Sequence, residues 1–140
     1  MIQSIIDGIS RKINATFGDG YDIYTEDVEQ GLNKSCFFIS CINPSNIQKL
    51  GVRYLRSHQF SIYYFPDSNE PKAECLRVLE QLYDALEYIE VDGDLVRGTN
   101  MRGEMSDDVL CFFVNYDVFV VKQVETVAME QLSYDGTIKE

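Results

Sequence analysis

The stretch from Val109 to Lys122, VLCFFVNYDVFVVK, constrains the fold most because it reads as one long β-strand. Alternate residues on one side of it are all apolar, which is the period of a strand with one buried face. These residues are Leu110, Phe112, Val114, Tyr116, Val118 and Val120. The other side is apolar at its ends and polar in the middle, so we expect it to be partly covered. A strand of this length belongs in the middle of a sheet.

Two segments have the periodicity of amphipathic helices. The first carries apolar residues at helical spacing near the start of the chain and ends at Gly18: Ile2, Ile5, Ile6, Ile9, Ile13 and Phe17. The second is expected from about Glu70 to Glu87, with Pro71 in its first turn. Its predicted apolar stripe consists of Cys75, Leu76, Leu79, Leu82, Tyr83 and Leu86. Both helices need to dock on a sheet, because most helical stability in proteins comes from packing.

Further apolar runs predict five more strands, which are Tyr21–Thr25, Cys36–Ile42, Val52–Phe65, Ile89–Val91 and Leu95–Met105. Asn43, Pro44 and Ser45 are turn residues and are expected to end the second of these strands, before a loop through Lys49. Asp92 and Gly93 predict a tight turn.

The order of helix, strands, helix, strands predicts a single-domain α+β fold, in which a mainly antiparallel sheet carries two helices on one face. We place this domain at residues 1–122. From residue 123 the periodicity is lost, so residues 123–140 are expected to be an extended or disordered tail.

The charge of the chain limits the classes of partner. Its 140 residues include 12 Lys and Arg against 23 Asp and Glu, a net charge of -11. Such a surface repels phosphate backbones and anionic membranes, which argues against a general nucleic-acid or membrane-surface binder. We see no signal peptide and no apolar run of transmembrane length. The four cysteines lack C-x-x-C spacing and are expected to be buried thiols in a reducing cytoplasm.

Residues typical of catalysis and metal binding are scarce. His58 is the single histidine, which removes nearly every Ser/His, Cys/His and zinc arrangement, and we expect it to be exposed or hydrogen-bonded. Four acids lie at predicted turns where calcium binding is conceivable, but the EF-hand pattern is absent and such acids usually cap backbone amides. They are Asp92, Asp94, Asp107 and Asp108. We therefore assign no catalytic, cofactor-binding or metal-binding residue.

Five stretches, taken in order, carry a family resemblance. They are YTEDVEQGL from Tyr24, CFFISC from Cys36, GVRYLRSHQFSIYYFP from Gly51, VDGDLVRG from Val91 and FFVNYDVFV from Phe112. Together they resemble the small tail terminator (tail completion) proteins of long-tailed phages and prophages of Gram-positive bacteria. The resemblance extends over residues 1 to about 122 and includes no catalytic motif.

This resemblance implies a structural, non-enzymatic protein that caps the head-proximal end of the tail tube, stops tail polymerisation and helps to join the tail to the head. It also implies an α+β domain that assembles into a hexameric ring. The implied partners are further copies of the chain, the tail tube protein and a neck or head-completion protein, without cofactor, specific nucleic acid or membrane. The implied location is the virion tail, after assembly in the bacterial cytoplasm.

Candidate interface residues are predicted from their position alone. A cyclic head-to-tail ring joins two different, complementary patches. We therefore expect an acidic patch on one protomer to meet a basic patch on the next. The acids are Glu26, Asp27 and Glu29, and the bases are Arg53 and Arg56. For each residue, simple exposure to solvent is the alternative.

A second predicted contact consists of Asp92, Asp94 and Arg97, at a hairpin tip that would touch the tube or neck protein. Two other classes of function remain as alternatives. One is an acidic, phage-encoded DNA mimic that inhibits a host DNA-binding protein, although the acids here are scattered rather than aligned along one face. The other is an enzyme with paired carboxylates, although no acid has a setting that obviously perturbs its pKa.

Overall fold

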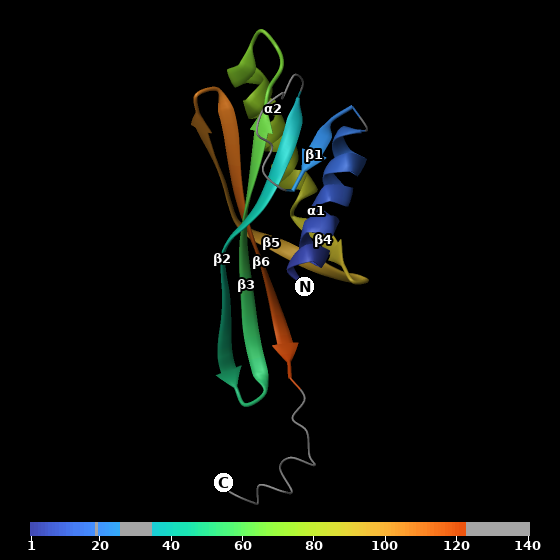
Figure 1. The fold of residues 1–140 in the computed structure, drawn as a ribbon, viewed down its shortest axis with the longest axis vertical. Helices are drawn as coiled ribbons and strands as arrows, with labels where there is room; N and C mark the ends of the chain where they lie inside the picture. The colour runs from blue at the N-terminus through green and yellow to red at the C-terminus, as the bar shows by residue number, and fades with distance from the viewer. Residues whose placement is uncertain (19, 26–34, 123–140) are drawn as a thin grey trace, which may run out of the picture.

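A computed structural model describes residues 1–18, 20–25 and 35–122. The elements in order are α1 (Ile2–Phe17), β1 (Asp22–Tyr24), β2 (Cys36–Leu50), β3 (Arg53–Phe65), α2 (Pro71–Ala85), β4 (Tyr88–Val91), β5 (Asp94–Ser106) and β6 (Val109–Val121). The described strands form one sheet in the order β1-β2-β3-β6-β5-β4, antiparallel except for the parallel pair β1 and β2. Both helices pack against this sheet (Figure 1), which confirms the predicted single-domain α+β fold.

Strand β6 is central, as its sequence predicts. It pairs with β3 on one side and with β5 on the other. Its predicted buried side is fully buried from Leu110 to Tyr116, whereas Val118 and Val120 are only half-buried. The end of β6, to which these two residues belong, extends past both helices (Figure 1). The strand is therefore longer than the core that it organises.

The end of the sheet that extends past the helices forms an arm, which we define as residues 43–59 and 117–122 (Figure 1). Its three strands are the end of β2, the start of β3 and the end of β6. A turn at Gly51, with φ 58°, joins β2 to β3. Exposure increases along β3 towards Arg53, so this end of the strand projects from the core.

The predicted end of the second long strand at Ile42, and the loop predicted through Lys49, are wrong. Strand β2 continues to Leu50 and stays paired with β3. The register shifts between Ile42 and Ser45, and Asn43 adopts φ 50°. The residues that suggested a turn instead form a β-bulge, where an unpaired residue and a proline are tolerated within a ladder.

Helix α1 buries the middle of the predicted stripe, since Ile5, Ile9 and Ile13 are fully covered. Ile6 and Phe17 are half-buried, and Ile2 is 38% exposed. The predicted stripe of α2 is only partly correct. Leu76 is 54% exposed and Tyr83 is 39% exposed. An apolar set spread over more than one helix face cannot all point at one sheet, so part of it faces solvent. The buried face of α2 instead includes Val78 and, unpredicted, a carboxylate.

That carboxylate belongs to Glu74, which accepts hydrogen bonds from the Tyr64 hydroxyl and, at 3.2 Å, from the Ser35 hydroxyl. Burial by itself acts to raise the pKa of this carboxyl group. Hydrogen bonds from Ser68, Tyr64 and Ser35 outweigh burial and leave the pKa below its ordinary value. The ionised group therefore ties the start of α2 to β3.

A second polar junction lies where α2 meets β5. The Tyr116 hydroxyl donates to the Leu86 carbonyl at 2.6 Å, and the Gly98 amide donates to the Glu87 carbonyl at 2.7 Å. A Cβ at Gly98 would lie 2.6 Å from the Leu86 oxygen. Only glycine lets β5 approach this closely, so the strand is held against the end of the helix.

We predict that Glu74→Gln lowers the free energy of unfolding at pH 7 by about 2 kcal/mol, the scale of hydrogen bonds to a charged group. Because the folded-state pKa of Glu74 is lowered, this stability is present above the unfolded pKa and is lost as the pH falls through the folded value. The difference in stability between the two proteins should therefore shrink as the pH falls below the unfolded pKa of about 4.3 and vanish below the folded pKa. Denaturant unfolding across pH measures this, with Glu80→Gln on the exposed side of α2 as control. Equal losses in both variants would contradict the assignment.

Candidate functional site

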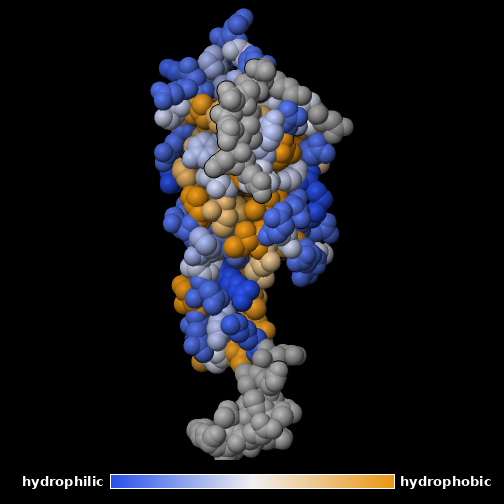
Figure 2. Space-filling view, in the orientation of Figure 1, coloured by the Kyte–Doolittle hydropathy of each residue, from blue (hydrophilic) through white to orange (hydrophobic). Residues whose placement is uncertain are grey.

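The arm presents an apolar outer face, which continues the side of the sheet that faces away from the helices. Ile47, Leu55 and Phe119 are direct neighbours across its three strands. Phe119 is 67% exposed, and Val121, two residues further along β6 on the same side, is 63% exposed. Figure 2 shows apolar atoms, in orange, at the surface of this lower end of the molecule. We call these exposed or half-buried residues the arm patch: Ile47, Leu50, Leu55, Phe119 and Val121.

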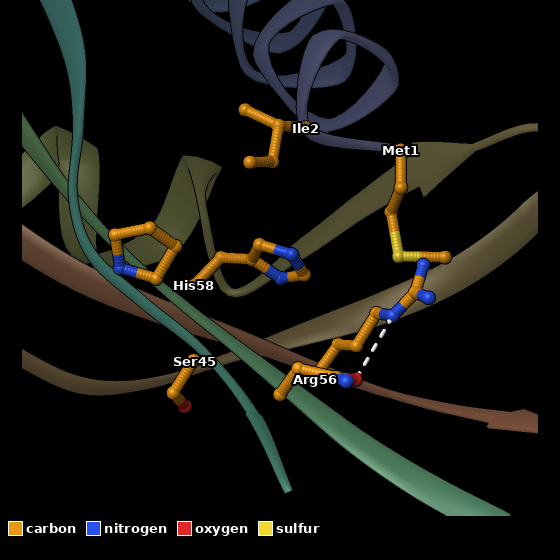
Figure 3. Close-up of a pocket in the computed structure, with 7 residues that line it drawn as sticks. Met1, Ile2, Ser45, Arg56 and His58 are labelled. Atoms are coloured by element: carbon orange, nitrogen blue, oxygen red, sulfur yellow. Dashed lines mark hydrogen bonds between the residues drawn. The ribbon is translucent and has the colours of Figure 1, made fainter.

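The opposite face of the arm meets the start of α1 at an open pocket of about 460 Å³ (Figure 3). Its lining residues are Met1, Ile2, Pro44, Ser45, Asn46, Arg56 and His58. Arg56 Nε donates to Asn46 Oδ1 at 3.1 Å, which holds the guanidinium at the pocket. A cation beside apolar side chains suits a contact with another chain better than acid–base chemistry.

His58 is buried at the root of the arm, and its Nδ1 lies 3.1 Å from the Tyr116 carbonyl oxygen. A carbonyl oxygen can only accept a hydrogen bond, so Nδ1 carries the hydrogen. The predicted hydrogen-bonded histidine is confirmed, and it is buried rather than exposed. Its contact joins β3 to β6 where the arm begins.

The arm is basic, although the chain is acidic. Residues 43–59 and 117–122 contain four basic residues and one acid, which leaves eight basic and 22 acidic residues in the rest of the chain. Arg53 and Arg56 lie here on opposite faces of β3, as their spacing predicts. The acids predicted to meet them, Glu26, Asp27 and Glu29, lie outside the described residues.

The structure places the three residues of the predicted hairpin contact in two different positions. Asp92, with φ 51°, and Gly93 form the tight turn between β4 and β5, and Asp92 and Asp94 are both exposed there. Arg97 instead pairs with Tyr88 at the far end of β4, and its guanidinium lies 5.9 Å from the Tyr88 ring centre. It also lies 3.6 Å from the Glu87 carboxylate, an exposed ion pair of small energy.

The other residues considered for chemistry lie apart. Asp107 and Asp108 form a separate turn between β5 and β6. In residues 1–18, 20–25 and 35–122, no three His, Cys, Asp or Glu side chains are grouped to hold a metal ion. Burial raises the pKa of all four cysteine thiols, which keeps them protonated and unreactive. Neither described helix has the length and apolar content to cross a membrane.

Sequence reasoning does not predict the arm patch, because its members are distant in sequence. Ile47 falls in the segment predicted to be a loop, Leu50 falls between that loop and the next predicted strand, and Phe119 and Val121 fall on the less regular side of the central strand. Continuing the β-period through Asn43 and Pro44 would have placed Ile47 on a strand. Predicting that Ile47 lies in line with Phe119 across the sheet also requires the order in which the strands pair.

One solved structure with a similar fold is the sheath/tube terminator, in its extended state, of PVC, an extracellular contractile injection system. The TM-score is 0.56 at 12% identity, and the match covers 93% of this chain and 66% of that chain. This chain thus spans just under two thirds of that protein, and the likeness shows the fold alone. A second solved chain matches at 11% identity with a TM-score of 0.43, over 89% of this chain and 98% of its own length. No curated protein matches the sequence.

The sequence also matches a family model, and this match extends over residues 4–128. It includes all of α1 except its first two residues, the whole of α2, all described strands and the whole arm. The description of that family is phage tail terminator protein. Because the match covers nearly the whole chain, the protein belongs to the phage tail terminator family.

Proposed function

We propose that this chain caps the head-proximal end of the tail tube of a long-tailed phage or prophage of Gram-positive bacteria, stops tail polymerisation and helps to join tail to head. The family match over residues 4–128 carries this proposal. Likeness of fold to a sheath/tube terminator supports it. The role is structural rather than enzymatic, and its site is the virion tail after assembly in the cytoplasm.

We propose further that the chain works as a ring, with a hexamer as the expected size. The tube protein lies on one side of this ring and a neck or head-completion protein on the other. A ring presents the same surface repeatedly around the axis of a tube, which suits a cap. The acidic body also suits a channel through which DNA passes, because like charges repel.

The distribution of charge argues against the DNA-mimic alternative. Such a mimic needs carboxylates spread along an elongated face. The elongated part of this molecule is the arm, which has four basic residues and one acid. Phosphate mimicry would therefore fail along the longest surface that the described residues offer.

The direct test is deletion of the gene for this chain from the phage or prophage that encodes it. We expect tails of uncontrolled length that are not joined to heads, because polymerisation has lost its stop. Electron microscopy of lysates measures tail length and head joining, and re-expression of the chain should restore both. Tails of normal length attached to heads in the deletion would overturn the proposal.

The proposed ring predicts that Arg53→Glu together with Arg56→Glu weakens self-association at least tenfold, because two bases facing an acidic neighbour become acids. Light scattering after gel filtration, over a concentration series at moderate salt, measures the mass. Lys72→Glu with Arg77→Glu, on the exposed side of α2, is the matched control with the same change in charge. An unchanged oligomer in the first variant would exclude these arginines from the interface.

The hairpin between β4 and β5 is proposed to touch the tube or neck protein. We predict that Asp92→Asn with Asp94→Asn impairs tail-length control or head joining while leaving the fold intact, since asparagine tolerates the φ of 51° at position 92. The control, Asp107→Asn with Asp108→Asn, removes the same charge from the other turn. Because Arg97 lies away from the turn, Arg97→Gln is tested separately for tail-length control and head joining. Normal tails from the first variant would show that the tip makes no such contact.

A further inference from the structure

We propose that the arm patch seats on the body of a second copy of this chain and forms the principal apolar contact between neighbouring subunits. This inference rests on the proposed function, because it assigns a surface to the proposed ring. It goes beyond the charge pairing of Arg53 and Arg56, since the contact that it names is apolar and includes residues of three strands, β2, β3 and β6.

Nothing in residues 1–18, 20–25 and 35–122 covers the patch or explains its apolar character. Phe119 and Val121 are 67% and 63% exposed, and the end of β6 to which they belong extends past the helices (Figure 1). Cross-strand neighbours Ile47 and Leu55 extend the apolar surface over the full width of the arm. Contiguous exposed apolar surface on a soluble protein commonly marks an interaction site. Burying it stabilises a complex by about 25 cal/mol for each Å² removed from water.

Charge selects the occupant. The arm patch is flanked by Lys49, Arg53 and Lys122, all exposed, so its partner must supply acids around an apolar centre. The rest of this chain has 22 acids against eight basic residues. The arm extends away from its own body (Figure 1), so it meets these acids on another molecule. A contact between the basic arm of one copy and the acidic body of the next joins two different patches. This is the head-to-tail type of contact, which can close a ring.

The inference predicts that Phe119→Thr weakens self-association roughly tenfold or more, since aromatic anchors dominate such interfaces. Leu95→Thr is the matched control, because Leu95 is likewise a strand residue, 72% exposed, outside the arm. Threonine keeps β-propensity at both positions. Light scattering over a concentration series up to the millimolar range measures the mass, and circular dichroism confirms that both variants fold.

The outcomes separate this inference from the function on which it rests. Loss of assembly in Phe119→Thr but not in Leu95→Thr supports the arm contact. Assembly of Phe119→Thr like the unchanged protein overturns the arm contact and leaves the ring standing. A strict monomer at every concentration overturns self-contact through the arm, while the gene deletion still tests tail termination independently.

Zero-length cross-linking identifies the occupant. We would mix ¹⁵N-labelled and unlabelled chains and join lysine amines to carboxylates with a carbodiimide. Cross-links between Lys49 or Lys122 of one label and body carboxylates of the other support a second copy as occupant. Mixed-label cross-links that omit the arm lysines overturn it. Cross-links from these lysines only to added tube protein would also overturn it, in favour of the tube.

Discussion

Pairing of β6 with β3 and β5 at once is the constraint on which the rest of the structure depends. Leu110, Phe112, Val114 and Tyr116 place four fully buried side chains on one side of this strand. Helices α1 and α2 dock over that side, so the core is defined by where β6 is covered. The same strand continues past the helices, and its ladder with β3 extends with it. One uninterrupted ladder therefore builds both the core and the arm.

The arm has a different balance of forces from the core. Its strands are held mainly by backbone pairing and cross-strand contacts, because the two described helices reach it only where the start of α1 meets its inner face. The Lys122 ammonium lies 4.8 Å from the Tyr54 ring centre, and the Ser57 hydroxyl donates to Asp117 at 2.6 Å. Such exposed contacts fix the register but bury little apolar surface. The outer face of the arm thus leaves apolar surface exposed to water. Burying that surface against a partner would stabilise the complex.

Local periodicity predicts those helices and strands whose apolar pattern is complete within their own residues. The alternation in β6 and the isoleucine stripe of α1 are of this kind. The β2 bulge is not, because Asn43 and Pro44 fit a turn and a bulge equally well, and only pairing with β3 decides between them. Burial of Glu74 likewise depends on Tyr64, which belongs to another element. Contacts between distant segments are what the sequence leaves open.

The candidate surfaces are likewise only partly predictable from local sequence. Arg53 and Arg56 are evident as a basic pair in the sequence, but the basic character of the arm emerges only when β6 brings Lys122 beside β3. The residues 43–59 and 117–122 then form one positive element on a chain with 11 net negative charges. Such an asymmetry makes unlike ends of two copies attract and like ends repel. Repulsion between like ends opposes contact of arm with arm, so the charge pattern favours contact of the arm of one copy with the body of another.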